Sequence, residues 1–242
     1  MYKIGIDVGS TFTKYCVMKD NEIVDLFFEK TPIKQKEYFQ EKIAKLKKQY
    51  YKPVIKSCVY GKNNIDSVVF LNELTALARG TYYLFGNQNI VLDIGGQDTK
   101  IISQNNGLLK DFFLNDRCAA GSGMFLQNTC SLLNINFDDI DLSKEDEPTI
   151  KVSSTCAVFA QSEITQLLAN NVDEMDIIKA VIWQTLTKAK ALYDKIKTNS
   201  VILSGGFARI KGINRYCEKV FGCHCYIDEK SPYLSAIGCC LL

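Results

Sequence analysis

An internal repeat limits the fold of this chain more than any other feature of its sequence. Residues 3–30 read as three short strands separated by two turns, and residues 89–114 read the same way. The two segments align without a gap, with Asp7 on Asp93, Gly9 on Gly95, Thr13 on Thr99, Lys14 on Lys100 and Asp25 on Asp111. A match that stays in register through three strands indicates duplication. The sequence therefore predicts two homologous halves, each opening with a three-strand meander.

Helical periodicity fills most of the chain outside the repeat. The longest amphipathic stretch runs from about Asp176 to Lys195, and others follow the first meander and the second. Further strands are predicted over residues 54–60, 201–203 and 225–227. This mixture predicts an α/β protein.

Composition excludes several classes of protein. The 29 basic and 27 acidic residues leave a net charge of +2, which argues against a nucleic-acid or membrane-surface partner. The N-terminus resembles no secretory signal, and no apolar run approaches the length of a membrane span. We therefore expect a cytoplasmic protein whose ten cysteines are reduced, serving as packing residues, metal ligands or catalytic groups.

Each repeat ends a buried strand with an aspartate and continues into a turn that contains glycine. Glycine lets backbone N–H groups approach an anion, and Ser10 and Thr11 add hydroxyl donors. Asp7 and Asp93 would then face each other across a pseudo-twofold cleft. Carboxylates beside a polyphosphate favour a shared Mg²⁺. The alternative is that each glycine only marks a strand end.

A third glycine pair, in Ser204–Ala208, follows a predicted strand and could lie flat against a nucleoside. The whole arrangement resembles the actin-like ATPase superfamily of sugar kinases, heat-shock chaperones and actin. Asp7–Lys14 and Asp93–Lys100 are similar to its two phosphate motifs, and Ser204–Ala208 to its adenosine motif. The resemblance implies two RNase H-like halves around a nucleotide cleft, with a C-terminal helix that packs on the first half. On this basis residues 1–88 plus 231–242 form one half, and residues 89–230 form the other.

Two of the cysteines lie where a helix is predicted to begin. Cys118 is in N-D-R-C-A-A-G-S-G, and Cys156 is in S-S-T-C-A, with Ser and Thr at capping positions. Free N–H groups at a helix start lower a thiol pKa and favour a thiolate ligand. Two such thiols supply half of a Cys₄ site, which a twofold dimer would complete around one shared [4Fe–4S] cluster. A dimeric Cys₄ zinc site and simple buried cysteines are the alternatives.

The motifs around these cysteines resemble those of a narrower family. N-D-R-C-A-A-G-S-G-M-F-L and S-S-T-C-A-V-F-A-Q-S-E-I are similar to the two cluster motifs of the activators of 2-hydroxyacyl-CoA dehydratases. That family includes the ATPase subunits of benzoyl-CoA reductase and the reductases of double-cubane cluster proteins. The similarity covers nearly the whole chain. The chain departs from the family pattern at Leu77, where a His is usual, and at Met124, Gln161 and Ser235.

The resemblance implies a homodimeric ATPase that transfers single electrons at low potential. A ferredoxin or flavodoxin would reduce the cluster, and ATP binding and hydrolysis would drive the electron to a partner iron–sulfur dehydratase or reductase. Two other functions stay open on the same fold, a small-molecule (sugar-type) kinase and a non-redox structural or chaperone-like ATPase. Neither would gain from Cys118 and Cys156.

Positioning and charge stabilisation dominate phosphoryl transfer, so the candidate residues are those of the turns. Asp7 and Asp93 are assigned to Mg²⁺, Gln97 and Asp98 to the attacking water, and Glu73 more weakly to the same role. The residues assigned to cofactor binding are Gly9, Ser10, Thr11, Lys14, Gly95, Gly96, Gly121, Gly123, Gly205 and Gly206. Cys118 and Cys156 are assigned to the cluster, and the other eight cysteines to packing.

Overall fold

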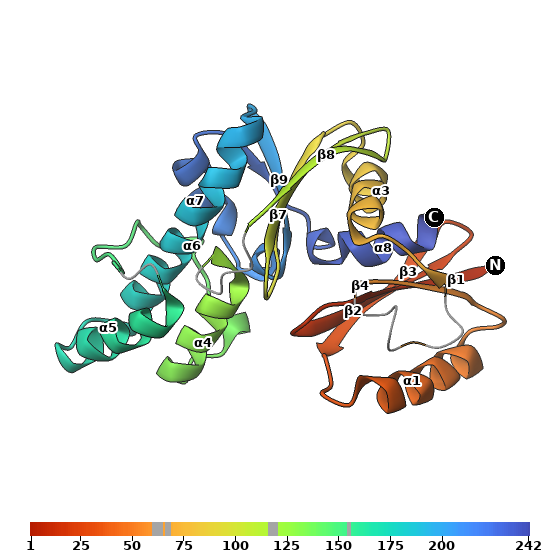
Figure 1. Cartoon of the computed structure of the whole chain (residues 1–242), viewed down its shortest axis with the longest axis horizontal. Coiled ribbons are helices and arrows are strands. Elements are labelled where there is room, and N and C mark those ends of the chain that lie inside the picture. Colours follow the sequence, from red (N-terminus) through yellow and green to blue (C-terminus); the bar gives the residue numbers. More distant parts are fainter. Residues whose placement is uncertain (60–64, 66–68, 116–120, 154–155) are drawn as a thin grey trace. The chain divides into compact units, whose positions relative to one another are not determined.

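The structure, a computed structural model, describes residues 1–59, 65, 69–115, 121–153 and 156–242 (Figure 1). They cluster into two compact units. The first comprises Met1–Asn89, Ile102–Asp111 and Tyr233–Leu242, and the second comprises Ile90–Ile101 and Phe112–Pro232. None of the helices in the described ranges is both long and apolar enough to cross a membrane.

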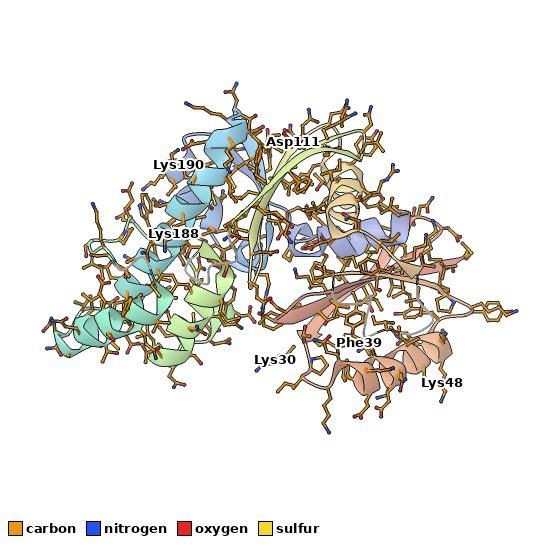
Figure 2. The ribbon with its side chains drawn as sticks, in the orientation of Figure 1. Lys30, Phe39, Lys48, Asp111, Lys188 and Lys190 are labelled. Atoms are coloured by element: carbon orange, nitrogen blue, oxygen red, sulfur yellow. The ribbon has the colours of Figure 1, made fainter. Side chains whose placement is uncertain are left out.

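The first sheet has the strand order β3-β2-β1-β4-β5. Its strands are β1 (Tyr2–Val8), β2 (Phe12–Lys19), β3 (Glu22–Lys30), β4 (Val54–Val59) and β5 (Val69–Phe70). The first three form an antiparallel meander, and β4 and β5 extend the sheet in parallel beside β1. Helix α1 (Gln35–Gln49) joins the meander to β4 and buries an apolar stripe that includes Phe39. Figure 2 shows Phe39 on the side of α1 that faces the sheet, whereas Lys48 points away from it.

The second sheet repeats this plan in the order β10-β9-β6-β7-β8. Its strands are β6 (Ile90–Ile94), β7 (Thr99–Asn105), β8 (Leu108–Leu114), β9 (Ser200–Gly205) and β10 (His224–Tyr226). Strand β9 pairs in parallel with β6, as β4 does with β1, and β10 pairs in parallel with β9. Two mixed sheets with the same strand order confirm the predicted α/β fold with two similar halves.

The other helices in the described residues are α3 (Glu73–Phe85), α4 (Gly123–Leu133), α5 (Ala157–Ala169), α6 (Glu174–Ile196), α7 (Ile213–Phe221) and α8 (Leu234–Leu241). Helical periodicity predicted three of them, α4, α5 and α6. Among the described residues there are also the short 3₁₀ turns η2 (Phe137–Asp139), η3 (Gly206–Arg209) and η4 (Ser231–Tyr233). Helices α4 to α7 and the inner strands β6 and β9 enclose one large apolar core.

Helix α8 lies directly against α3 and β1, at contacts that only glycine permits (Figure 1). A Cβ atom on Gly238 would lie 1.7 Å from the carbonyl oxygen of Ala76 in α3. A Cβ on Gly80 would lie 1.9 Å from the carbonyl oxygen of Leu234, and one on Gly5 would lie 1.9 Å from that of Ala236. The C-terminal helix is therefore held by close backbone contact with both elements.

The tip of the β7–β8 hairpin belongs to the first compact unit because it is tied to the end of α3. The Gln104 side-chain amide donates to the carbonyl oxygens of Gly86 (3.1 Å) and Gln88 (2.9 Å). Its oxygen accepts from the backbone N–H of Gly107 at 2.7 Å. The compact units thus differ from the predicted halves over Ile102–Asp111, and by one or two residues at Asn89 and at residues 231–232. The division into homologous halves remains a prediction.

Strands β4 and β9 end in matching backbone turns. Val59 is the register partner of Val8, and Gly205 is the register partner of Ile94, so the two positions correspond. Both have a left-handed backbone, with φ of 60° at Val59 and 81° at Gly205. Glycine adopts this conformation freely, whereas a β-branched residue is strained in it by about 1–2 kcal/mol.

Val59→Gly is therefore expected to stabilise the protein by about 1 kcal/mol, which corresponds to a rise in Tm of roughly 2–4 °C. Thermal and urea unfolding measure this change. The matched control is Val54→Gly at the other end of β4, where the side chain is 39% exposed, and there glycine is expected to destabilise by roughly 0.5–1 kcal/mol. A lower Tm for Val59→Gly would show that packing of the valine side chain outweighs the backbone strain.

Candidate functional site

Asp7 lies at the end of β1, between its cross-strand neighbours Lys14 on β2 and Cys58 on β4. The Lys14 Nζ atom is 3.5 Å from Oδ2 of Asp7, and the Cys58 thiol donates to Oδ1 across 3.7 Å. The aspartate is only 7% exposed. Each of its carboxylate oxygens therefore has a partner on a different neighbouring strand.

The turn after Asp7, residues 9–11, is braced by a threonine from the far end of β3. The Thr31 hydroxyl donates to the carbonyl oxygen of Gly9 at 2.8 Å, and its backbone N–H donates to that of Thr11 at 2.9 Å. The Thr11 hydroxyl is buried and finds no hydrogen-bond partner among the residues that the structure describes. A buried hydroxyl without a partner suits a site that accepts an external anion.

Glu73 opens helix α3, where the Asn72 side chain caps the helix by accepting from the backbone N–H groups of Leu74 and Thr75. The negative charge of Glu73 contributes to raising the pKa of Cys58, the cysteine whose thiol donates to Asp7. A hydrogen bond with Cys239, burial, and the charges of Asp7 and Glu73 raise the pKa of Cys58 well above its usual range. The charges of Asp7 and Glu73 thus both act on the Cys58 thiol.

The second turn differs from the first in the aspartate that its lysine contacts: Lys14 contacts the strand-end Asp7, whereas Lys100 contacts Asp98. Asp93 ends β6 and is 8% exposed, with Ser204 of β9 as its cross-strand partner. The lysine that corresponds to Lys14, Lys100, is buried and has its Nζ 3.4 Å from Oδ1 of Asp98. The carbonyl oxygen of Asp98 accepts from the backbone N–H of Gly95 at 2.9 Å. Lys100 therefore orients Asp98 within the turn.

The second turn is hydrogen-bonded directly to the start of α4. The backbone N–H of Gly123 donates to the carbonyl oxygen of Gly95 at 2.7 Å, and that of Met124 donates to the carbonyl oxygen of Gly96 at 3.0 Å. The Ser122 hydroxyl also donates to Gly96 at 3.0 Å. A Cβ on Gly123 would lie 2.9 Å from the Gly95 oxygen, so the approach needs glycine.

The residues just before α4 are anchored to the same turn and strand. The carbonyl oxygen of Gly121 accepts from the Thr99 hydroxyl at 2.6 Å and from the Asn115 side-chain amide at 3.2 Å. Gly121 and Gly123, assigned to cofactor binding from the sequence, thus use their backbone groups within the protein. Cys118 lies outside the described residues.

Cys156 is itself the N-cap residue of α5, in place of the serine or threonine expected there. Its side chain is partly exposed. The backbone N–H groups of Val158 and Phe159, helped by the charge of Lys188, lower the pKa of the thiol, although it makes no cap hydrogen bond within the described residues. Val158 and Phe159 are 72% and 71% exposed. The thiol thus lies at an open, electropositive helix start, which suits a thiolate ligand.

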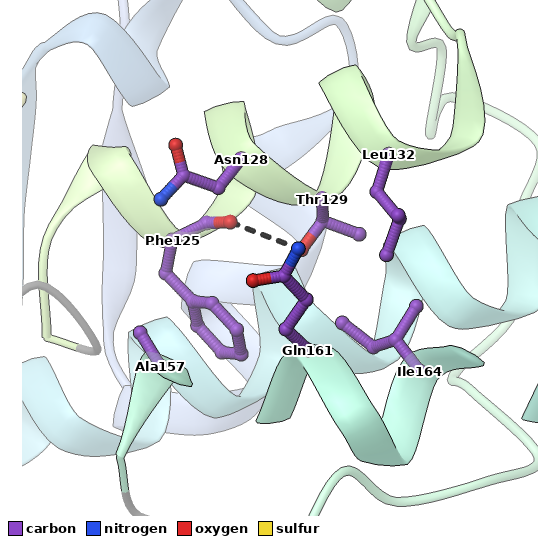
Figure 3. Close-up of a pocket in the computed structure, with 7 residues that line it drawn as sticks. All are labelled: Phe125, Asn128, Thr129, Leu132, Ala157, Gln161 and Ile164. Atoms are coloured by element: carbon purple, nitrogen blue, oxygen red, sulfur yellow. Dashed lines mark hydrogen bonds between the residues drawn. The ribbon is translucent and has the colours of Figure 1, made fainter. Parts of the chain in front are cut away.

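A small hollow of about 30 Å³ separates α4 from α5 (Figure 3). It is lined by Phe125, Asn128, Thr129 and Leu132 of α4 and by Ala157, Gln161 and Ile164 of α5. The Thr129 hydroxyl donates its hydrogen to the carbonyl oxygen of Phe125 at 3.0 Å. The hollow has room for about one or two water molecules. It shows that α4 lies beside the first half of α5.

The third glycine pair lies where β9 passes into η3. A Cβ on Gly205 would lie 2.3 Å from the carbonyl oxygen of Ile94, so this glycine is required by close packing against β6. Gly206 is more open, since the nearest described atom to a Cβ there is 3.9 Å away. The hydroxyl of Ser204 donates to the carbonyl oxygen of Ser231 at 2.9 Å. Asp93, Ser204 and Gly205 thus lie together at the carboxyl ends of the neighbouring parallel strands β6 and β9.

Sequence reasoning missed the contacts of Thr31 and Cys58. Cys58 was assigned to packing, and it is indeed buried, but it also donates to Asp7. Its place at the end of a predicted strand was a usable signal, because a parallel neighbour of the first strand brings that end beside Asp7. In the described ranges no group of three or more His, Cys, Asp or Glu side chains is arranged to hold a metal ion.

These features define an actin-like ATPase fold, with two similar sheets that each carry an aspartate and a glycine-containing turn. The solved glucokinase of the ROK family from Streptomyces griseus, with glucose and AMPPNP, shares this fold alone, with a TM-score of 0.59, 12% identity, and coverage of 99% of this chain and 98% of that chain. Residues 4–242 match the BadF/BadG/BcrA/BcrD ATPase family, and the chain belongs to that family.

Individual members of the family are similar over their full lengths. The (R)-2-hydroxyglutaryl-CoA dehydratase activating ATPase of Acidaminococcus fermentans is 31% identical over 252 residues, covering 100% of this chain and 96% of the relative. The activator of lactoyl-CoA dehydratase of Anaerotignum propionicum is 32% identical over 251 residues, with the same coverage. The activator of 2-hydroxyisocaproyl-CoA dehydratase from Clostridium difficile, solved with bound ADPNP, superposes with a TM-score of 0.89 at 28% identity, covering 100% of this chain and 93% of that one. The predicted family and fold class are confirmed.

Proposed function

We propose that this protein is a cytoplasmic ATP hydrolase that couples ATP turnover to low-potential electron transfer and so activates a partner iron–sulfur enzyme. The observation that carries the proposal is the direct hydrogen bonding between the second turn and the start of α4. Loss of a γ-phosphate would shift Gly95 or Gly96. Because these residues are hydrogen-bonded to the start of α4, the shift would also move that helix start, which follows Cys118 in the sequence. Relatives that are named as activators of acyl-CoA dehydratases, one of them solved with ADPNP, support the same reading.

In this proposal the two turns bind the phosphates of ATP. Asp7 and Asp93 hold Mg²⁺, and the hydroxyl of Thr11, which has no partner within the described structure, donates to a phosphate oxygen. Asp98, oriented by Lys100, and Gln97 position the attacking water, with Glu73 as a further candidate. The water attacks the γ-phosphorus and the bond to the β-phosphate oxygen breaks, giving ADP and inorganic phosphate.

The cysteines would form a cluster site across a homodimer, with Cys118 and Cys156 from each of two chains. The open, electropositive position of Cys156 fits a thiolate ligand. Exposed Val158 and Phe159 beside it offer an apolar surface that a second chain would cover. When bound, a [4Fe–4S] cluster takes up one electron from a ferredoxin or flavodoxin and passes it to an iron–sulfur dehydratase or reductase.

Two other functions on the same fold make no use of Cys156. A small-molecule kinase transfers phosphate to a hydroxyl of a bound substrate, and a structural ATPase binds protein without redox chemistry. The relatives that cover the whole chain are named for dehydratase activation, which favours the electron-transfer proposal over both.

Anaerobic purification tests the proposal. The protein is expected to be brown, to contain about four iron atoms per two chains and to hydrolyse ATP without a small-molecule phosphate acceptor. Iron and sulfide analysis, the visible spectrum and phosphate release measure these properties. A colourless, iron-free protein that still hydrolyses ATP would contradict the electron-transfer role, and phosphate transfer to a sugar would favour the kinase.

A further inference from the structure

The buried thiol of Cys58 is directed at a carboxylate. Its Sγ lies 3.7 Å from Oδ1 of Asp7, and both residues are buried, with 0% and 7% of their surface exposed. The thiol of Cys240, by comparison, is directed at the backbone carbonyl oxygens of Lys3 and Cys16. A donor in this buried position restricts the carboxylate to one orientation.

The surrounding elements hold this thiol in place. Cys58 is the direct register partner of Asp7 in the parallel β1–β4 pair, so the backbone fixes the spacing between them. Cys58, Ala76 and Cys239 form one buried cluster beneath α8. Helix α8 packs closely against α3 there, since a Cβ atom on Gly238 would lie 1.7 Å from the carbonyl oxygen of Ala76. The thiol is thus surrounded by closely packed elements.

The second half of the repeat lacks this contact. Ser204 occupies the position opposite Asp93 that Cys58 occupies opposite Asp7. Its hydroxyl donates to the carbonyl oxygen of Ser231 at 2.9 Å. The lysine contact differs as well, since Lys14 is paired with Asp7 whereas Lys100 is paired with Asp98. Two side-chain donors therefore converge on the carboxylate of the first turn.

We propose that Cys58 is a positioning residue that, together with Lys14, sets the orientation of the Asp7 carboxylate toward the Mg²⁺ of bound ATP. This inference rests on the proposed assignment of Asp7 to Mg²⁺. Lys14 holds Oδ2 through a charge-assisted contact, and the thiol holds Oδ1. A thiol is a weak donor, so it orients the oxygen while leaving its remaining lone pair available to the metal or a metal-bound water.

The test measures Mg²⁺ dependence without turnover. Binding of a fluorescent ADP analogue to the full-length protein is titrated with Mg²⁺ and repeated in EDTA. Cys58→Ala is expected to raise the Mg²⁺ concentration for half-maximal enhancement of binding about three- to tenfold, the equivalent of one lost hydrogen bond, with nucleotide affinity in EDTA unchanged. Cys58→Ser, which keeps a donor, is expected to stay within about twofold of the wild type.

Cys16→Ala is the matched control, because Cys16 is an equally buried thiol of the same sheet on the neighbouring strand β2. It is expected to leave the Mg²⁺ dependence unchanged even if it lowers Tm as much as Cys58→Ala does. The inference is wrong if the Mg²⁺ dependence shifts equally in both alanine variants, or does not shift in Cys58→Ala. Either result would leave the proposed function untouched. If wild-type binding does not respond to Mg²⁺, the assignment of Asp7 to the metal is wrong and the inference falls with it.

Discussion

Gly238→Ala is expected to destabilise the protein by more than about 3 kcal/mol. The added methyl group would lie 1.7 Å from the carbonyl oxygen of Ala76 and 2.5 Å from its carbon. Backbone atoms of α3 cannot rotate away as the end of a side chain can, so α8 and α3 must separate. Separation would expose the cluster of Cys58, Ala76 and Cys239 to water.

Ser235→Ala tests whether α8 tolerates change in general. Ser235 is on the same helix and is 5% exposed, and its replacement by alanine adds no atoms. We expect a loss below about 1 kcal/mol. Urea unfolding followed by circular dichroism compares the two variants with the wild type. A Gly238→Ala midpoint equal to that of Ser235→Ala would show that α8 does not lie against the backbone of α3 as described.

Helix α8 also lies close to the proposed nucleotide site. Cys239 follows Gly238 and lies in one buried cluster with Cys58, whose thiol donates to Asp7. Displacement of α8 is therefore expected to weaken Mg²⁺-dependent nucleotide binding in any Gly238→Ala protein that remains folded. A helix at the C-terminal end of the sequence thus supports a carboxylate near its N-terminal end.

Patterns that can be read along the chain were enough to predict the meanders, the two aspartates and the α/β class. Strand alternation depends on neighbouring residues and the repeat on an ungapped comparison of two segments, and together they placed Asp7 and Asp93 near strand ends. The N-cap of α5 was predicted less well, because Cys156 occupies the position expected for Ser or Thr. Ser and Thr are preferred at N-cap positions, but the preference does not exclude other residues such as this cysteine.

Contacts between distant segments could not be predicted in the same way. The repeat aligns Lys14 with Lys100, and nothing in the sequence shows that one pairs with the strand-end aspartate and the other with Asp98. The difference arises because Asp98 stands where the first repeat has Phe12, which leaves Lys14 no acidic partner in its own turn. Likewise, glycine is needed at Gly5 and Gly80 because the backbone of α8, a helix far along the chain, packs directly against both positions.

Cys156→Ala is expected to reduce the iron content of anaerobically purified protein to less than about one-tenth of the wild-type value. A cluster held by two chains loses two of its four thiolates at once, and Fe–S clusters depend on cysteine thiolates for binding. Alanine preserves the start of α5, because Cys156 makes no cap hydrogen bond there. Iron and acid-labile sulfide analysis, with the visible absorbance, measures the loss.

Cys223→Ala is the matched control, since Cys223 is also a partly exposed cysteine of the second unit. Burial raises the pKa of its thiol, whereas the helix start lowers the pKa of Cys156, so Cys156 is the better suited of the two to act as a thiolate ligand. The Cys223 variant is expected to keep its full iron content, and both variants are expected to bind an ATP analogue within about twofold of the wild type. Full iron retention by Cys156→Ala would exclude this thiol as a ligand. Loss of iron and nucleotide binding together would instead mean that Cys156 has a structural role in the fold of the second unit.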